Sequence, residues 1–303
     1  MCDVNGLKLV NDAFGHKEGD RLLKRFADVL RKSSRDGDLV GRWGGDEFLF
    51  VVPHADEQVL KKLSGRIKDR CKETSADRIP ISVSTGYAVV GGSEVSVDDA
   101  INLAEERMYR NKLTESRSAR HSIISSLEQT LRETTKETFE HSQRFLKLSR
   151  EVGEELGLSS DEVNSLQLLA RFRDIGNVGI PESVLKKKGT LTRSEWKIVR
   201  KHPAIGYNIA RSTPDLLAIA EAILCHHERW DGSGYPQGIP GDRIPLLSRI
   251  ISVVASYDAM TEERPYKKPL CAAKAKEELK RCSGSQFDPT IVDAFLRTVD
   301  KTT

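Results

Sequence analysis

Residues 226–236 read HHERWDGSGYP, two adjacent histidines followed by a turn-rich run. They come after an apolar stretch at Leu216–Cys225 and open the long irregular segment Glu228–Pro245, which is rich in Gly and Pro. From about residue 113 onward strand signals are absent, and capping boxes at Ser159-x-x-Glu162 and Thr192-x-x-Glu195 mark helix starts. The sequence therefore predicts an all-α second half that carries one long loop.

The histidine pair has companions elsewhere in this half. Glu137 and His141 are four residues apart in helical sequence, which places both on one helix face. Histidines and acids spread over separate helices are typical of a buried multi-metal site. A histidine pair alone is more commonly a partly exposed helix end. The candidate ligands are Glu137, His141, Asp174, His202, His226 and His227.

The first 112 residues alternate two hydrophobic periods. Helical spacing at residues 22–30 is followed by short apolar strands at Leu39–Val40 and Phe48–Val52. A second helical face at residues 59–71 leads to a strand at Ile81–Val90, and then to a helix opened by Ser96-x-x-Asp99. This alternation predicts an α/β domain of a sheet covered by helices.

A glycine pair joins the first two of these strands. Gly44 and Gly45 permit a tight hairpin that delivers Asp46 and Glu47 at its tip. Taken alone, a glycine turn with acids is more often an ordinary surface hairpin. The segment from Asp3, however, supplies another carboxylate at a strand end, which favours a shared polar site.

These motifs resemble the GGDEF family of diguanylate cyclases, which make cyclic di-GMP from two GTP molecules. The resemblance implies that Asp3 and Asp46 hold Mg²⁺ on the triphosphate. It places the nucleotide at Asn11, Asp20, Gly44, Gly45, Glu47 and Lys112. Of these, Asn11 and Asp20 would read the guanine edge and Lys112 would bind a phosphate. A solvated lysine at a helix end is the alternative for Lys112.

Two further points bear on the cyclase. Arg35 and Asp38 match the family's Arg-x-x-Asp inhibitory site for product. Met1 stands two positions before Asp3, where family members carry a preceding helical stretch. We therefore expect that opening helices and half of the first strand are absent, or belong to a longer parent chain, and that this chain is not an efficient cyclase.

The second half resembles the HD-GYP family, HD-domain phosphohydrolases that linearise cyclic di-GMP. The resemblance runs from about Gln129 to Leu296 and includes residues 261–266 and 284–289, TEERPY and GSQFDP. It implies two or three iron or manganese ions on the six candidate ligands, which would activate a water. It also implies substrate contacts from Gly232, Gly234, Tyr235, Pro236, Arg264 and Tyr266.

Three positions depart from the HD-GYP pattern. Arg173 replaces the histidine of the His-Asp pair, Ala255 replaces a late aspartate ligand, and Asn177 replaces a lysine. A guanidinium has no lone pair to offer and repels a divalent ion, so we expect one ion or none. Arg173 could instead hold a phosphate directly, or accompany a decayed, empty site. A register slip of three residues would put Asp258 in the ligand position of Ala255.

We therefore expect a partial GGDEF domain at 1–113, a linker helix at 114–128 and an HD-GYP domain at 129–303. Three hypotheses follow: a cyclic di-GMP sensor or scaffold that does not hydrolyse, or only weakly; a metal-dependent cyclic di-GMP phosphodiesterase; or a diguanylate cyclase in the intact parent chain. The resemblance implies GTP and cyclic di-GMP as small-molecule partners and a homodimer.

Composition excludes several other classes. The 303 residues carry 48 Lys+Arg against 45 Asp+Glu, a formal charge of +3 without a basic stripe, which argues against a nucleic-acid partner. No apolar run approaches the roughly 20 residues of a membrane span. The five cysteines are odd in number and widely spaced, so we expect a bacterial protein of the reducing cytoplasm.

Overall fold

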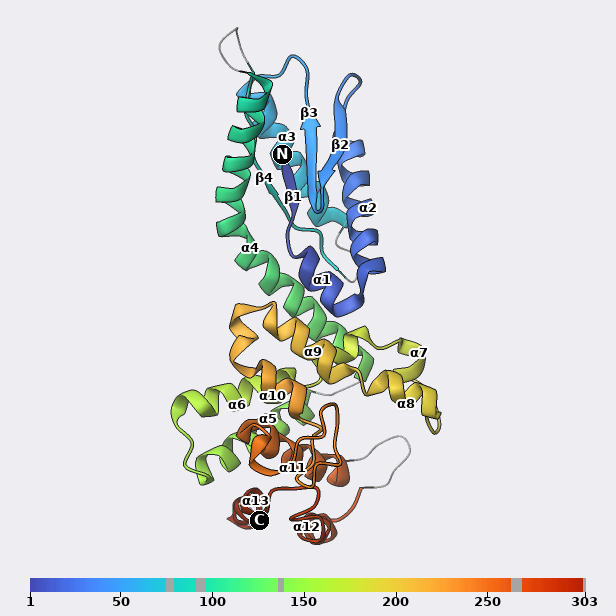
Figure 1. Cartoon of the computed structure of the whole chain (residues 1–303), viewed down its shortest axis with the longest axis vertical. Helices are drawn as coiled ribbons and strands as arrows, with labels where there is room; N and C mark the ends of the chain where they lie inside the picture. Colours follow the sequence, from blue (N-terminus) through green and yellow to red (C-terminus); the bar gives the residue numbers. More distant parts are fainter. Residues whose placement is uncertain (75–78, 91–95, 136–138, 263–268, 302–303) are drawn as a thin grey trace. The chain divides into compact units, whose positions relative to one another are not determined.

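The computed structural model describes residues 1–74, 79–90, 96–135, 139–262 and 269–301 (Figure 1). The chain divides into two compact units, Met1–Gln129 and Thr130–Thr303, and each is described by itself. The first contains a small sheet with helices and the second is helical, which confirms the predicted α/β and all-α organisation. Among the helices in the described ranges, none is both long and apolar enough to cross a bilayer.

The first unit is built on a four-stranded antiparallel sheet in the order β2-β3-β1-β4. The strands are β1 (Cys2–Val4), β2 (Leu39–Gly44), β3 (Glu47–Val51) and β4 (Val83–Thr85). The β2–β3 hairpin turns at Gly45, whose φ of 47° lies in the left-handed region that glycine adopts without strain. The register sets Asp3 opposite Glu47, so two carboxylates share neighbouring strands.

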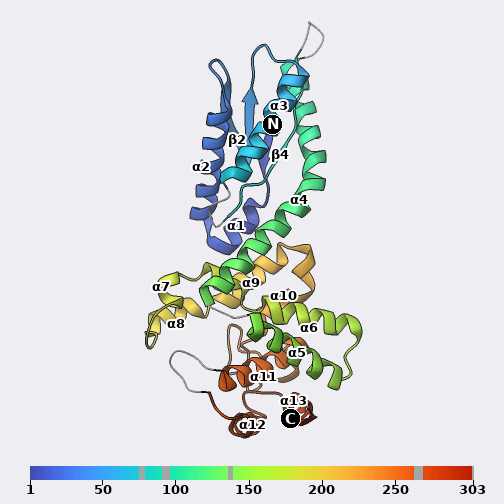
Figure 2. The ribbon, with the colours of Figure 1, turned by 180° about the vertical axis from the view of Figure 1, so that it is seen from behind.

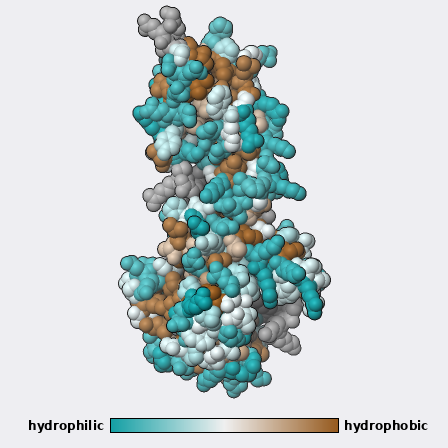
Figure 3. Space-filling model, in the orientation of Figure 1, coloured by the Kyte–Doolittle hydropathy of each residue, from teal (hydrophilic) through white to brown (hydrophobic). Residues whose placement is uncertain are grey.

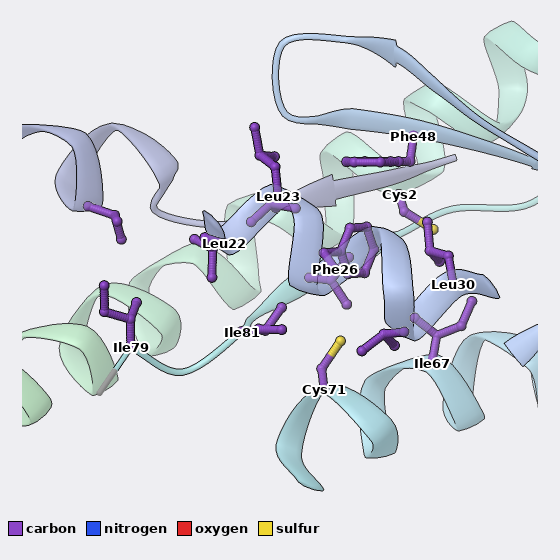
Figure 4. Close-up of a cluster of buried hydrophobic side chains, with 14 of the residues drawn as sticks. Cys2, Leu22, Leu23, Phe26, Leu30, Phe48, Ile67, Cys71, Ile79 and Ile81 are labelled. Carbon is purple, nitrogen blue, oxygen red and sulfur yellow. The ribbon is translucent and has the colours of Figure 1, made fainter. Parts of the chain in front are cut away.

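Helices cover both faces of this sheet. They are α1 (Leu7–Phe14), α2 (His16–Ser33), α3 (Glu57–Glu73) and α4 (Val97–Thr135). Phe48 packs edge-on against Phe26 of α2, with ring centroids 5.1 Å apart, in a core that α3 completes (Figure 4). Figure 2 shows α3 over the face that Figure 1 hides. The next residue, Leu49, points the opposite way and packs with Met108 of α4, as strand alternation requires.

The last strand is shorter than the predicted Ile81–Val90, because regular pairing ends at Thr85. Its neighbour Gly86 touches α4 so closely that a Cβ there would lie 2.1 Å from the Ala104 carbonyl oxygen. Gly86 nevertheless exchanges two backbone hydrogen bonds with Met1, at 2.8 and 3.0 Å, and the next carbonyl, that of Tyr87, accepts from Arg107 of α4. Figure 3 shows hydrophobic residues gathered where α4 begins; the exposed ones there are Val51, Val89, Val90 and Val97.

The second unit consists of helices and short 3₁₀ segments. The helices are α5 (Phe139–Glu155), α6 (Ser160–Phe172), α7 (Glu182–Leu185), α8 (Arg193–Val199), α9 (His202–Arg211), α10 (Ala220–Cys225), α11 (Leu246–Thr261), α12 (Ala272–Arg281) and α13 (Pro289–Lys301). The 3₁₀ segments are η2 (Ile175–Gly179), η3 (Pro214–Ile219) and η4 (Gly241–Arg243). Both predicted capping boxes form, at Ser159 before α6 and at Thr192 before α8.

Two glycines bring the functional segments of this unit together. A Cβ at Gly176 of η2 would lie 1.9 Å from the His202 carbonyl oxygen and 2.6 Å from the Gly206 nitrogen of α9. On the other side, a Cβ at Gly206 would lie 2.8 Å from Ile223 of α10. The backbones of η2, α9 and α10 can approach this closely only because both positions lack a side chain.

Candidate metal centre

Four side chains from these segments converge on one point. One ligand atom from each of Asp174, His202, His226 and His227 lies within 4.8 Å of all the others. Asp174 precedes η2, His202 begins α9 and His226 follows α10. The Asp174 Oδ1 atom lies 3.6 Å from the His202 Nε2 and 3.8 Å from the His226 Nε2. Three imidazoles and a carboxylate are a donor set suited to a divalent transition metal.

The histidine tautomers favour a cation between them. Nδ1 of His202 lies 2.8 Å from the Val199 carbonyl oxygen, and Nδ1 of His226 lies 2.6 Å from that of Ile223. A carbonyl oxygen only accepts, so we assign the proton to Nδ1 in both rings. The two Nε2 atoms then present lone pairs to one another at 3.2 Å. A metal ion bound by both Nε2 atoms would remove this repulsion. The arrangement of the two rings therefore fits a divalent metal ion.

Two of the three histidines, His202 and His227, have lowered pKa values that favour the neutral form, the form in which imidazole binds a metal. Burial lowers the pKa of His202, although the nearby Asp174 carboxylate acts in the opposite direction. Burial together with the neighbouring imidazoles of His226 and His202 lowers the pKa of His227 to about 2. Protons therefore do not compete for these rings near neutral pH.

Arg173 places a fixed positive charge beside the group. Its Nε lies 3.2 Å from Asp174 Oδ2, its Nη1 donates to the Ala170 carbonyl, and its guanidinium lies 4.0 Å from the ring centroid of Phe145. Burial alone would raise the pKa of Asp174, but the Arg173 guanidinium beside it holds that pKa well below its ordinary value. Asp174 is therefore an anion paired with a cation that the chain itself supplies.

The remaining predicted ligand positions lie elsewhere or outside the described residues. Glu137 lies outside the described residues. His141 lies on α5, but its side chain is not among those described. Ala255 lies half-buried on α11. Asp258, three residues later, is buried and paired with Arg144 at 3.1 Å, outside the group of four. Asn177 lies within η2.

The loop after the histidines covers one side of the group. The Tyr235 ring stacks on His227, with centroids 4.8 Å apart and planes at 21°, and burial raises its pKa to about 12. The guanidinium of Arg200 lies 5.0 Å from the centroid of the same ring.

The other predicted substrate-contact positions are mainly in the same loop. Gly234 admits no side chain, because a Cβ would lie 2.4 Å from the Arg229 nitrogen. Gly232 has a φ of 78°, and Pro236 follows Tyr235 in the chain. Arg264 and Tyr266 lie outside the described residues.

A buried carboxylate holds this loop in place. Glu228 is 3% exposed and accepts hydrogen bonds from the backbone nitrogens of Gln237, at 2.7 Å, and Gly238, at 3.0 Å. Sequence analysis missed both Glu228 and Arg200. An acid beside the histidine pair was a usable signal for Glu228, whereas nothing in the local sequence marks Arg200.

A second polar cluster lies in the first unit. Lys112 of α4 donates to the buried Asp3 carboxylate at 2.6 Å, and the other Asp3 oxygen has no hydrogen-bond partner among the described residues. Burial raises the pKa of Asp3, and the Asp46 charge adds to this while Lys112 opposes it. Burial and the charges of Asp3, Glu105 and Asp46 raise the pKa of Glu47. Several carboxylates therefore share one cation, an arrangement that suits a divalent ion.

The predicted nucleotide residues surround this cluster only in part. A pocket of about 360 Å³ lies between α2 and the β2–β3 hairpin, and Asp20 and Arg42 line it. The Asn11 side-chain oxygen is buried, without a hydrogen-bond partner in the described ranges, and sits where a side chain on Gly19 would be. Gly44 ends β2 and carries no such contact.

The two residues of the predicted inhibitory site, Arg35 and Asp38, form an ion pair with each other. The Nε of Arg35 lies 3.3 Å from the Asp38 carboxylate, and another guanidinium nitrogen donates to the Pro53 carbonyl at 2.7 Å. The guanidinium is therefore partly occupied by protein acceptors.

Comparison with known proteins confirms both predicted resemblances. The sequence profile of the HD domain matches residues 125–291, and that of the diguanylate cyclase GGDEF domain matches residues 1–118. A cyclic di-GMP phosphodiesterase of Thermotoga maritima is 43% identical over 163 residues, which cover 53% of this chain and 44% of that protein.

Two further relatives differ in their named substrates. A 3'3'-cGAMP-specific phosphodiesterase of Vibrio cholerae is 30% identical over 268 residues, covering 81% of this chain and 51% of that protein. A cyclic di-GMP phosphodiesterase response regulator of Xanthomonas campestris is 42% identical over 148 residues, covering 48% of this chain and 39% of that protein. The chain thus spans about half, or less, of the length of these relatives.

Proposed function

The chain belongs to the HD domain family, and from this we propose that its second unit is a metal-dependent phosphodiesterase of cyclic dinucleotides that works with one divalent ion. The observation that carries the proposal is the pair of Nε2 atoms of His202 and His226, which face each other at 3.2 Å beside a carboxylate. The names of the relatives support a cyclic dinucleotide, cyclic di-GMP first and 3'3'-cGAMP second, as the substrate class.

We assign different roles to the side chains of this unit. His202, His226, His227 and Asp174 would hold the ion, which supplies positive charge that polarises a phosphoryl oxygen. Arg173 adds a second positive charge for the phosphodiester, since the guanidinium is partly accessible, with 15% of its side chain exposed. The Tyr235 ring excludes water from the His227 side of the group. Hydrolysis adds water across one P–O bond and leaves a linear dinucleotide.

A cyclic di-GMP receptor that does not hydrolyse is the second candidate. The observation in its favour is the identity of two side chains: Arg173 and Ala255 stand where the HD-GYP pattern has ligands, and neither can bind a metal. In that case the guanidinium beside Asp174 would bind phosphate without chemistry.

For the first unit we propose nucleotide binding. Asp3 and Asp46 would take Mg²⁺, Lys112 would move from Asp3 to a phosphate of GTP, and the pocket at Asp20 would receive the base. Arg35 and Asp38 would bind product only after leaving their mutual contact. We also propose that the chain is cytoplasmic and forms a homodimer. Its proposed parts are a partial GGDEF domain at 1–113, a linker helix at 114–128 and an HD-GYP domain at 129–303.

The test is anaerobic hydrolysis of cyclic di-GMP by the purified chain with Mn²⁺ or Fe²⁺, with 3'3'-cGAMP as a parallel substrate. An Arg173→His, Ala255→Asp double variant serves as the repaired control. Turnover by the natural chain, abolished by a chelator, is the expected result. Turnover by the double variant alone would reject hydrolysis and establish the receptor instead.

A further inference from the structure

Arg200 lies outside the four-residue group but is connected to it through one aromatic ring. Its guanidinium carbon lies 5.0 Å from the centroid of Tyr235, and that ring stacks on His227 at 4.8 Å. We propose that Arg200 binds a non-bridging phosphate oxygen of the cyclic dinucleotide and thereby sets affinity for this substrate class. The inference rests on the proposed function of the second unit.

The guanidinium of Arg200 has N–H groups available to donate hydrogen bonds to a ligand. A guanidinium over an aromatic ring uses its face, and its N–H groups remain available at the edge. Within the described residues Arg200 has no ion-pair or side-chain hydrogen-bond partner. By contrast, Arg173 is paired with Asp174 at 3.2 Å and Arg229 with Asp231 at 3.2 Å. Of the three arginines Arg173, Arg200 and Arg229, Arg200 is therefore the one whose charge no carboxylate offsets in the described part of the chain.

The side chain of Arg200 also has no role in forming its helix. The residue follows α8 as its C-cap, and its backbone nitrogen donates to the Trp196 carbonyl at 2.9 Å. The residue is exposed, so its substitution should leave the fold intact. The contact with the Tyr235 ring, at 5.0 Å, holds the guanidinium next to the loop that follows the histidine pair.

The charge of the substrate explains why such a residue is needed. A cyclic dinucleotide carries two phosphates, and one divalent ion next to Asp174 can neutralise only the phosphate that it contacts. Arg173 is paired with Asp174 at 3.2 Å and therefore lies beside the ion, where it serves that same phosphate and not the other. A planar guanidinium with free N–H groups matches two phosphate oxygens at once, which an ammonium group cannot do.

The chain offers a matched control for this test. Arg211 makes the same type of contact, with its guanidinium 5.5 Å from the Tyr207 centroid, and is likewise exposed. Neither Arg211 nor Tyr207 belongs to the four-residue group. Arg211→Gln therefore removes an equivalent cation–π contact and an equivalent charge from the same unit.

The experiment is calorimetric titration of the Mn²⁺-loaded full chain with cyclic di-GMP and with 3'3'-cGAMP, at low and high salt. We expect Arg200→Gln to weaken binding roughly tenfold to a hundredfold, Arg200→Lys to weaken it less, and Arg211→Gln to leave it unchanged. The manganese content should not change in any variant. The salt dependence of binding should be smaller in Arg200→Gln, because a charge is lost.

Three results would count against the inference in distinguishable ways. Equal affinity in the natural chain and Arg200→Gln overturns the role of Arg200 and leaves the proposed function intact. A loss of affinity with unchanged salt dependence shows that Arg200 only positions Tyr235, and also overturns the inference. A natural chain that binds neither dinucleotide overturns the proposed function, and the inference with it.

Discussion

The Nε2 atom of His202 lies 3.2 Å from the Nε2 atom of His226, and each ring anchors its other nitrogen to a carbonyl oxygen one helical turn back. Neither ring can rotate away without losing that hydrogen bond. The two donors are thus held in position before any ion arrives, which reduces the cost of ordering the site on binding.

Removing one of these donors should abolish metal binding. We expect His226→Ala to lower the bound divalent ion from about one per chain to near zero, because the substitution removes one of the two opposed Nε2 donors and leaves only three ligands. Metal analysis after dialysis measures this. His16→Ala, at the exposed start of α2, is the control and should bind as the natural chain does. Full occupancy in His226→Ala would contradict the assignment.

Glu228 should affect substrate turnover without affecting metal binding. In Glu228→Gln the carboxylate that receives two backbone N–H groups is replaced by an amide with a single oxygen, so the loop that carries Tyr235 loosens. We expect kcat/KM for cyclic di-GMP to fall about tenfold with unchanged manganese content. Glu221→Gln removes an exposed acid that accepts from Tyr207 and serves as the control. Loss of metal in Glu228→Gln would show that Glu228 supports the ligands instead.

Lys112 should stabilise the first unit through Asp3. Lys112→Met leaves a carboxylate that is 1% exposed without its cation, and we expect a loss of about 1–3 kcal/mol in unfolding free energy. Urea denaturation followed by near-UV circular dichroism measures this change. Added Mg²⁺ should restore part of the stability, since the ion can replace the ammonium between Asp3 and Asp46.

The exposed Lys61→Met on α3 is the matched control for that variant, and its stability should change by less than about 0.5 kcal/mol. A Lys112→Met variant as stable as this control would mean that Asp3 becomes protonated at no cost when the lysine is absent.

Gly176 should be intolerant of even a methyl group. A Cβ there would overlap the His202 carbonyl oxygen at 1.9 Å, so Gly176→Ala must push α9 away from η2 and separate Asp174 from His202. We expect a destabilisation of about 1–3 kcal/mol together with weakened metal binding. Gly65→Ala on α3, where a Cβ meets nothing within 4 Å, should be neutral or stabilising by about 0.5–1 kcal/mol. Thermal melts with and without Mn²⁺ separate the two effects.

Local signals predicted much of this protein, because they depend on residues close in sequence. The capping boxes at Ser159 and Thr192 and the hairpin at Gly45 involve neighbours within four residues, and all three form. Asp174 and His202 are distant in sequence, and they were predicted as ligands of one site because both fall on motifs that resemble the HD-GYP family.

The predictions that failed, or were never made, depend on contacts across the fold. The strand predicted at Ile81–Val90 forms only at Val83–Thr85, because its length depends on which residues of the distant strand β1 lie opposite it, and no local pattern contains that pairing. Arg200 reaches Tyr235 from another helix, and a lone exposed arginine carries no signal in sequence.

The pairing of Arg173 with Asp174 has one more consequence. A guanidinium 3.2 Å from the carboxylate is part of the polypeptide, so no chelator can extract it and no oxidant can change its charge. A centre that relies on several metal ions loses positive charge when the metal is scarce. In this chain part of that charge is encoded genetically, and its presence is independent of metal supply.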